Sequence, residues 1–178
     1  MDAEYDRTVL GSTTPKFYYG LNLSASYKGF DFSALFQGLG GYQRQIGSYM
    51  AYAFYNGGQI QRWQAENCWT KENPDKWAEY PRIETMNMNH PNLQTSDYWV
   101  RNASFLRLKN LQLGYTLPQA WTKKIGIEKL RVYVSGQNLF SFNSFYQGWD
   151  PENEIGTGDS PSYYPITAIY SFGFNFKF

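Results

Sequence analysis

Cysteine and histidine are almost absent from this 178-residue chain, which has one of each, Cys68 and His90. A zinc site needs several such ligands at fixed spacing, and a Ser-His-Asp or Cys-His set could be assembled only around His90. The composition therefore argues against metal-dependent and triad-based enzymes. We expect no catalytic residue, no metal and no cofactor.

Long apolar runs and one-sided charge are also missing. No run of about 18 apolar residues occurs, which excludes an ordinary transmembrane helix. The net charge is +1, so no basic stripe points to nucleic acid. The first residues, MDAEYD, are acidic and lack an apolar segment, so we expect any export signal to lie upstream.

Aromatic residues are abundant instead. The chain has 16 Tyr, 13 Phe and 6 Trp, which together make 20% of it, although the mean hydropathy is only −0.58. Tyrosine and tryptophan suit surfaces that are apolar at one end and wet at the other. Membrane interfaces and carbohydrate-binding surfaces are both of this kind.

Five segments alternate apolar and polar residues with the period of a β-strand, over lengths typical of a tilted membrane-spanning strand of about 9–11 residues. In the first and last of them, large apolar side chains share one face. The residues on these two faces are Phe17, Tyr19, Leu21 and Leu23, and Tyr170, Phe172, Phe174, Phe176 and Phe178. The expected strands are 16–27, 30–38, 103–116, 129–141 and 166–178.

The third strand changes phase along its length. Leu106 and Leu108 alternate in one phase, whereas Leu111 and Leu113 follow the other. The break near Lys109–Asn110 indicates either a β-bulge or a strand that leaves the bilayer. In the fourth strand, Leu130, Val132 and Val134 alternate with Arg131, Tyr133, Ser135 and Gln137.

The aromatic stripes and the loop lengths together predict the fold class. A soluble core mixes side chains of different sizes, whereas a lipid-facing strand tolerates aromatics in line. The short connections 28–29 and 117–128 alternate with the long connections 40–102 and 142–165. We therefore predict an all-β, antiparallel up-and-down transmembrane β-barrel. Its lipid-facing residues would include Phe17, Tyr19, Leu21, Leu23, Phe172, Phe174 and Phe176.

Charged strand residues and barrel closure constrain this fold. Arg107, Lys109, Arg131 and Lys177 should face the lumen or a headgroup boundary, because a cation facing lipid costs about 2–4 kcal/mol at the midplane. Five strands cannot close a membrane barrel, since the smallest have about eight. We therefore expect the chain to be part of a larger protein.

Several motifs occur in a consistent order. They are PKFYYG with YKGFD and FQG near the start, WTKENP with YPR in the long connection, FLRLKN with LGYTLP, LRVYVSGQNL, GWDPE and the aromatic end. Across nearly the whole chain, this series resembles the C-terminal end of SusC/RagA-type TonB-dependent transporters of Bacteroidetes-like bacteria.

The resemblance implies a bacterial outer-membrane barrel of about 22 strands with a plugged lumen. It also implies upstream plug and TonB-contacting segments, a SusD-like surface lipoprotein partner and an oligosaccharide or peptide substrate. The expected partners thus include the TonB complex, the barrel-assembly machinery and outer-membrane lipid. Phe178 would be the aromatic signal that the assembly machinery reads.

The long connections hold the candidate contact residues for substrate or partner, which are Trp63, Trp69, Trp77, Trp99, Tyr146 and Trp149. Their flat rings could stack on sugars or peptides, or could pack within the loops themselves. The carboxylates of Asp150, Glu152, Glu154 and Asp159 could in principle attract calcium, but their spacing fits no EF-hand. We expect a solvated acidic loop.

Two other classes stay open from sequence. A soluble carbohydrate-binding β-sandwich could use the same tryptophans, and it predicts a chain that dissolves without detergent as a compact monomer. A secreted glycosidase fragment could use paired carboxylates, but nothing in the sequence fixes their separation.

Overall fold

The computed structural model describes residues 5, 7–85, 90–146, 148–153 and 166–178. These residues form two compact units. The sheet unit consists of residues 14–42 and 102–153 with the final segment that ends at Phe178, and the loop unit consists mainly of residues 43–101. Each unit is described below by itself.

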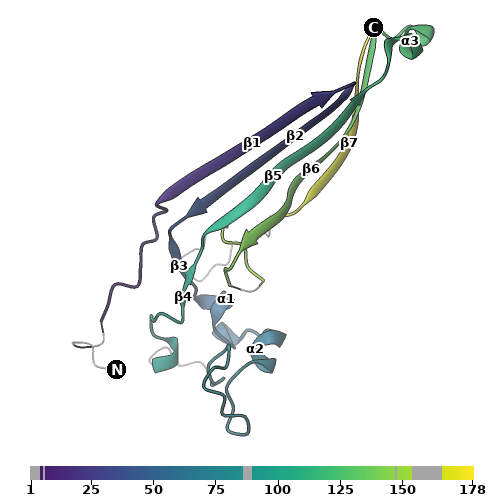
Figure 1. Ribbon diagram of the computed structural model, residues 1–178. Helices are drawn as coiled ribbons and strands as arrows, with labels where there is room; N and C mark the ends of the chain where they lie inside the picture. Colours follow the sequence, from purple (N-terminus) through teal and green to yellow (C-terminus); the bar gives the residue numbers. More distant parts are fainter. Residues whose placement is uncertain (1–4, 6, 86–89, 147, 154–165) are drawn as a thin grey trace. The chain divides into compact units, whose positions relative to one another are not determined.

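The sheet unit is a single antiparallel sheet in which each strand pairs with the next along the chain (Figure 1). This order is that of an up-and-down meander, and the strands lie close to the expected ranges. The strands are β1 (Phe17–Tyr27), β2 (Phe30–Gly40), β5 (Phe105–Thr116), β6 (Lys129–Asn143) and β7 (Ile169–Lys177).

Short connections join the strands at one end of the sheet (Figure 1). Lys28 and Gly29 link β1 to β2 and have φ angles of 46° and 87°. Two consecutive positive φ angles are the requirement of a type I′ turn, whose twist matches that of the flanking strands. Between β5 and β6, the chain forms α3 (Gln119–Thr122) and the 3₁₀ turn η3 (Lys123–Ile125).

The loop unit has little regular structure. Its two short strands, β3 (Gln43–Gln45) and β4 (Val100–Asn102), pair with each other. Four short helical segments follow one another between them: α1 (Ser48–Ala51), η1 (Tyr55–Gly57), α2 (Arg62–Glu66) and η2 (Pro91–Leu93). Among the described residues, no helix is long and apolar enough to cross a membrane.

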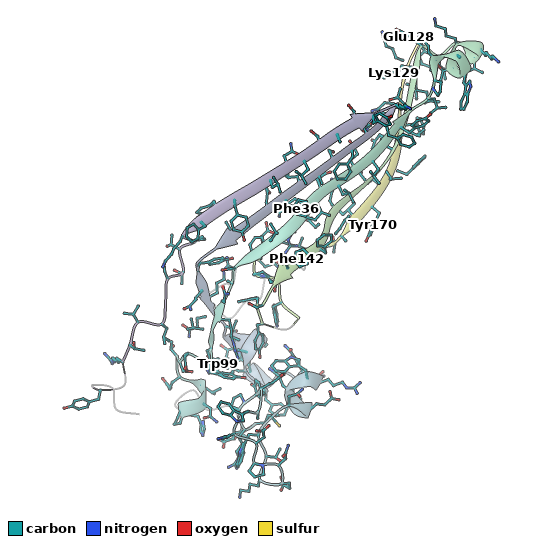
Figure 2. All side chains as sticks on the ribbon, viewed as in Figure 1. Phe36, Trp99, Glu128, Lys129, Phe142 and Tyr170 are labelled. Carbon is teal, nitrogen blue, oxygen red and sulfur yellow. The ribbon has the colours of Figure 1, made fainter. Side chains whose placement is uncertain are left out.

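A cluster of buried aromatic residues holds the loop unit together. Trp99 is 1% exposed, and the ring of Tyr52 meets it edge-on at a centroid distance of 5.1 Å. The buried hydroxyl of Tyr80 donates to the carbonyl of Ala51 at 2.8 Å and accepts from the amide of Ala53 at 3.0 Å. One phenol therefore ties two points of the irregular backbone to the aromatic core. Figure 2 marks Trp99 among the side chains.

Candidate functional site

One face of the sheet is apolar along all five strands. The pairing register places Leu23 of β1 opposite Ala34 of β2, which in turn lies opposite Leu111 of β5. The same face continues through Val134 of β6 to Phe172 of β7. Most of its large side chains are exposed or half-exposed, and Phe172 is 71% exposed, whereas Leu108 is 4% exposed. Phe36, Phe142 and Tyr170, which Figure 2 labels, belong to this face too.

A β-bulge keeps this face continuous. The pairing of β5 with both neighbours shifts at Lys109, so the expected bulge is confirmed. A bulge adds one residue and moves the following side chains to the other phase. Leu106 and Leu108 before the shift therefore share the apolar face with Leu111 and Leu113 after it.

The opposite face is polar, and an ion pair crosses it from β2 to β6. Arg131 Nε donates to Asp31 Oδ1 at 2.9 Å, and its Nη2 also donates to the other carboxylate oxygen. The pair passes over β5 at Gly114, where a built Cβ would lie 2.4 Å from Arg131 Nη2 and 2.6 Å from Asp31 Oδ1. Because Gly114 has no side chain, the ion pair can cross β5 and connect β2 with β6, which are not neighbours in the sheet.

A second glycine repeats this arrangement one strand further. The Arg131 guanidinium lies 4.9 Å from the centroid of the Tyr133 ring, within the range of a cation–π contact. That ring covers Gly173 of β7, where a built Cβ would be 2.6 Å from the phenol. A chain of side-chain contacts thus connects β2 with β6 and covers β7 at Gly173.

A second charged cluster holds the segment that follows β6. Arg107 is only 3% exposed, and its Nη2 donates to Asp150 Oδ1 at 2.5 Å. The Glu152 carboxylate lies 3.0 Å from Nε of Arg107. Its other oxygen forms an ion pair with Lys109. The expectation of a solvated acidic loop is therefore wrong for Asp150 and Glu152, because two strand cations face them.

Two further carboxylates of the acidic segment are not described. Glu154 and Asp159 lie outside the described residues. Within the described part of the chain, no group of three or more His, Cys, Asp or Glu residues could hold a metal ion.

The candidate loop aromatics occupy different environments. Trp99 lies in the core of the loop unit, and Trp63 packs edge-on against Tyr80 at 5.7 Å. Trp69 is half-buried, and its amide donates to the carbonyl of Tyr80 at 3.0 Å. Trp77 differs from these because its side chain is 79% exposed. Among the candidate aromatics of the loop unit, Trp77 is therefore the one whose ring is most open to a ligand or partner.

The two candidates in the sheet unit belong to the segment that the charged cluster holds. Tyr146 is buried and Trp149 is half-buried. Pro151 of the same segment is fully buried, and its carbonyl accepts a hydrogen bond from Tyr42 Oη at 3.2 Å. Phe178 lies just beyond β7 and is exposed.

Burial raises the pKa of three tyrosines described in the loop unit, Tyr52, Tyr80 and Tyr98. Desolvation raises the pKa of the Tyr98 hydroxyl to about 12, despite the opposing charge of Arg101 nearby. The hydroxyl donates to the carbonyl of Glu79 at 2.5 Å, so its neutral form has a defined role in holding the loop.

Sequence reasoning missed the residues that link strands distant in the chain. Asp31 and Arg131 are 100 positions apart, and nothing in their local sequence marks them as partners. The exposed Trp121 and Ile125, in the turn between β5 and β6, were also missed. The sequence did contain a signal for them, because two large apolar residues next to Lys123 and Lys124 in a short connection are unusual.

An up-and-down antiparallel sheet with one uncovered apolar face and one ion-paired polar face is typical of a transmembrane β-barrel wall. Known proteins agree with this class. The chain is 33% identical to TonB-dependent receptor P3 of Formosa agariphila over 97% of its own length. It is 38% identical over 47% of its length to TonB-dependent receptor SusC of Bacteroides thetaiotaomicron. No protein-family profile matches the sequence.

A solved structure agrees as well. The RagAB peptide importer in its "closed-closed" state superimposes with a TM-score of 0.71 at 29% identity, over 98% of this chain. The chain belongs to the SusC/RagA family of TonB-dependent receptors and corresponds to a part of such a receptor. It spans 17% of the length of receptor P3, 8% of SusC and 18% of the RagAB chain.

Proposed function

We propose that this chain forms part of the wall and surface loops of a TonB-dependent importer in the bacterial outer membrane. The observation that carries the proposal is the exposed apolar face that runs across β1, β2, β5, β6 and β7. Such a face is costly in water over this length, whereas hydrocarbon wets it without cost. Lipid contact is therefore assigned to Phe17, Tyr19, Leu21, Leu23, Phe172, Phe174 and Phe176.

The distribution of charge supports the same orientation. Arg107 and Arg131 lie on the polar face, each within reach of a carboxylate. No charged side chain is among the residues of the apolar face within the described strands. Since a charge facing lipid costs about 2–4 kcal/mol near the midplane, this segregation suits a wall between hydrocarbon and a wet lumen.

The loop unit is the part proposed to meet cargo or a partner. The cargo would be a large nutrient such as an oligosaccharide or a peptide, in line with the description of RagAB as a peptide importer. The partner would be a SusD-like surface lipoprotein. Trp77 is the first candidate contact, because an exposed indole gives a large apolar surface at a small entropic cost. Import would be driven by the TonB complex through upstream parts of the receptor.

The aromatic end of the chain has a proposed role in assembly. Phe178 follows β7 directly and continues the apolar series of Phe172, Phe174 and Phe176. Its ring stands 5.2 Å from that of Phe176. We expect Phe178→Ser to slow insertion by the barrel-assembly machinery more than Lys177→Ser, which alters the polar face. Equal insertion rates for the two variants in a pulse-chase experiment would count against this role.

Removing the loop unit tests the division of labour. The amide of Ala103 donates to the carbonyl of Tyr42 at 3.1 Å, so the two ends of the sheet unit that flank the loop unit lie side by side. A short Gly-Ser link could therefore replace residues 43–101 in the full receptor. We expect membrane insertion to persist and substrate capture or lipoprotein docking to fall. Undiminished uptake would overturn the assignment of the loop unit, and lost insertion would contradict the independence of the wall.

The alternative of a soluble carbohydrate-binding β-sandwich finds less support. A sandwich covers the apolar face of each sheet with a second sheet. The second sheet in the described residues has only the short strands β3 and β4, too little to cover five long strands. The glycosidase alternative is weakened by the charged cluster, because Asp150 and Glu152 are bound to strand cations rather than free to act as acid and base.

A further inference from the structure

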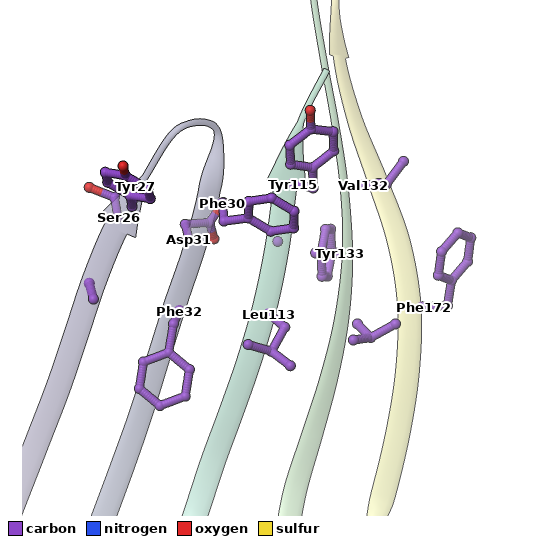
Figure 3. A pocket seen from close by; sticks show the side chains of 13 residues that line it. Ser26, Tyr27, Phe30, Asp31, Phe32, Leu113, Tyr115, Val132, Tyr133 and Phe172 are labelled. Carbon is purple, nitrogen blue, oxygen red and sulfur yellow. The ribbon is translucent and has the colours of Figure 1, made fainter. Parts of the chain in front are cut away.

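A groove is present on the sheet unit near the turn between β1 and β2. It has a volume of about 430 Å³, within the range of about 300–1,000 Å³ that is usual for small-molecule sites. Its lining comes from all five strands and is almost entirely apolar; Figure 3 shows Phe30, Phe32, Leu113, Tyr115, Val132 and Phe172 around it. On a membrane wall, such a groove would be filled by an alkyl chain.

Basic side chains surround this end of the sheet. Lys28 follows the groove residue Tyr27 and precedes Phe30, and the amide of Thr116 donates to the carbonyl of Gly29 at 2.7 Å. The β1–β2 turn therefore lies against the end of β5. The same end carries Lys123 and Lys124 in the next connection, as Figure 1 shows for α3. All three lysines are exposed.

These lysines are available for an external anion. The side-chain carboxylates of Asp31 and Glu128 at this end are already engaged, Asp31 by Arg131 and Glu128 by Lys177 at 2.8 Å. Lys28, Lys123 and Lys124 have no carboxylate partner within the described parts of the chain. An apolar groove beside unneutralised cations is complementary to an amphiphile with an anionic head.

Two further residues suit an interface at the same level. Trp121 and Ile125 are exposed and flank the two lysines of the connection between β5 and β6. Tryptophan is enriched where hydrocarbon meets headgroups, and lysine extends its ammonium to the polar side of that boundary. The connection therefore has the composition of an interfacial anchor, which places headgroups within reach of its cations.

We propose that this groove and these lysines form a binding site for an anionic phospholipid of the leaflet that meets the short turns. One acyl chain lies along Phe30, Leu113 and Phe172, and the phosphate contacts Lys28 with Lys123 or Lys124. The proposal rests on the proposed membrane-wall function, because it requires the apolar face to be in lipid. It adds a preference for headgroup charge, which contact with bulk lipid does not require.

The test uses the full receptor that contains this chain, delipidated in detergent. The protein is titrated with phosphatidylglycerol or with phosphatidylcholine of identical acyl chains, and bound lipid is counted by native mass spectrometry. We expect preferential retention of phosphatidylglycerol. Replacing Lys28, Lys123 and Lys124 by Gln should weaken that retention by about fivefold or more for each lysine that contacts the phosphate.

Two further variants make the test specific. Leu113→Trp fills the groove without changing charge and should reduce retention of phosphatidylglycerol too. Replacing Lys16, Lys71 and Lys76 by Gln removes the same charge elsewhere and should leave retention unchanged. Equal retention of the two lipids, equal loss in the control triple variant, or full retention in Leu113→Trp would each overturn the site.

Membrane insertion is measured separately, by heat-dependent gel mobility after refolding into vesicles. A receptor that inserts but shows no headgroup preference refutes the lipid site alone. A receptor that does not insert refutes the proposed function as well.

Discussion

The strongest test of the membrane wall compares the same new side chain on the two faces of one strand. Leu23 and Asn22 are neighbours near the middle of β1, and both are exposed. Leu23 is 44% exposed on the apolar face, where it lies opposite Ala34, whereas Asn22 lies opposite Leu35 on the polar face. Arginine at either position has identical chemistry, so any difference reflects the surroundings of that face.

The magnitude follows from where Leu23 lies. Its position near the centre of an 11-residue strand puts it near the bilayer midplane, where an arginine facing lipid costs about 2–4 kcal/mol. That cost lowers the ratio of folded to unfolded receptor by about 30-fold to 700-fold. At position 22 the guanidinium would reach water and the polar face, so we expect a change within about 0.5 kcal/mol.

The assay is refolding of the full receptor into phospholipid vesicles over a guanidinium series, with the folded fraction taken from heat-dependent gel mobility. Leu23→Ala serves as a control that separates lost packing from added charge, and it should shift the midpoint less than Leu23→Arg. Equal destabilisation by Leu23→Arg and Asn22→Arg would refute the assignment of the apolar face to lipid. A larger effect at position 22 would reverse that assignment.

Three further predictions concern individual contacts. Gly114→Ala should destabilise the receptor by about 1–3 kcal/mol, because the added methyl group displaces the charge-assisted hydrogen bond between Arg131 and Asp31. The loss should be smaller in an Arg131→Met background, which a double-mutant cycle in guanidinium unfolding would measure. Trp99→Ala should cost about 3–5 kcal/mol of loop-unit stability, whereas Trp77→Ala should leave proteolytic resistance unchanged and weaken partner or substrate binding. Because the pKa of Tyr98 is raised from 10 to about 12, the unfolded state loses this proton first, so its contribution to stability is complete below pH 10 and is lost as pH rises towards 12. Alkaline unfolding of Tyr98→Phe should be less steep over that window, and identical curves would contradict the assignment.

The strands were predictable because their signal is local. Alternation along β1 and β7 fixes which residues share a face, and the register agrees with it. Even the irregularity of β5 was visible, since Leu108 and Leu111 could not share a face without an inserted residue. The loop unit was predictable only as a long connection. Its fold depends on single contacts such as that of Tyr80 with Ala51, which leave no periodic trace in the sequence.

The acidic segment shows a different reason for failure. Asp150 and Glu152 look like solvated residues when read alone, because the sequence gives no sign of which cations they will meet. Their partners, Arg107 and Lys109, are about 40 residues away in the sequence. These two cations are two positions apart on β5, so they share a face, and only the fold brings Glu152 to them. The charge balance of the acidic segment therefore depends on its contact with β5, which the sequence alone does not reveal.

The two faces of the sheet therefore differ in how their cohesion arises. In the proposed membrane wall, each residue of the apolar face would contribute through its own contact with hydrocarbon, so a single substitution there would act locally. On the polar face, long side chains reach across strands where Gly114 and Gly173 leave room, so that Asp31 on β2 holds Arg131 on β6, and Arg131 in turn meets Tyr133 over β7. A substitution at Gly114 would thus disturb the link between β2 and β6, two strands that do not pair with each other. If this reasoning holds, Gly114→Ala should lower amide-exchange protection around Asp31 on β2 and Arg131 on β6 more than Leu113→Ala does, although both positions pair with these two strands.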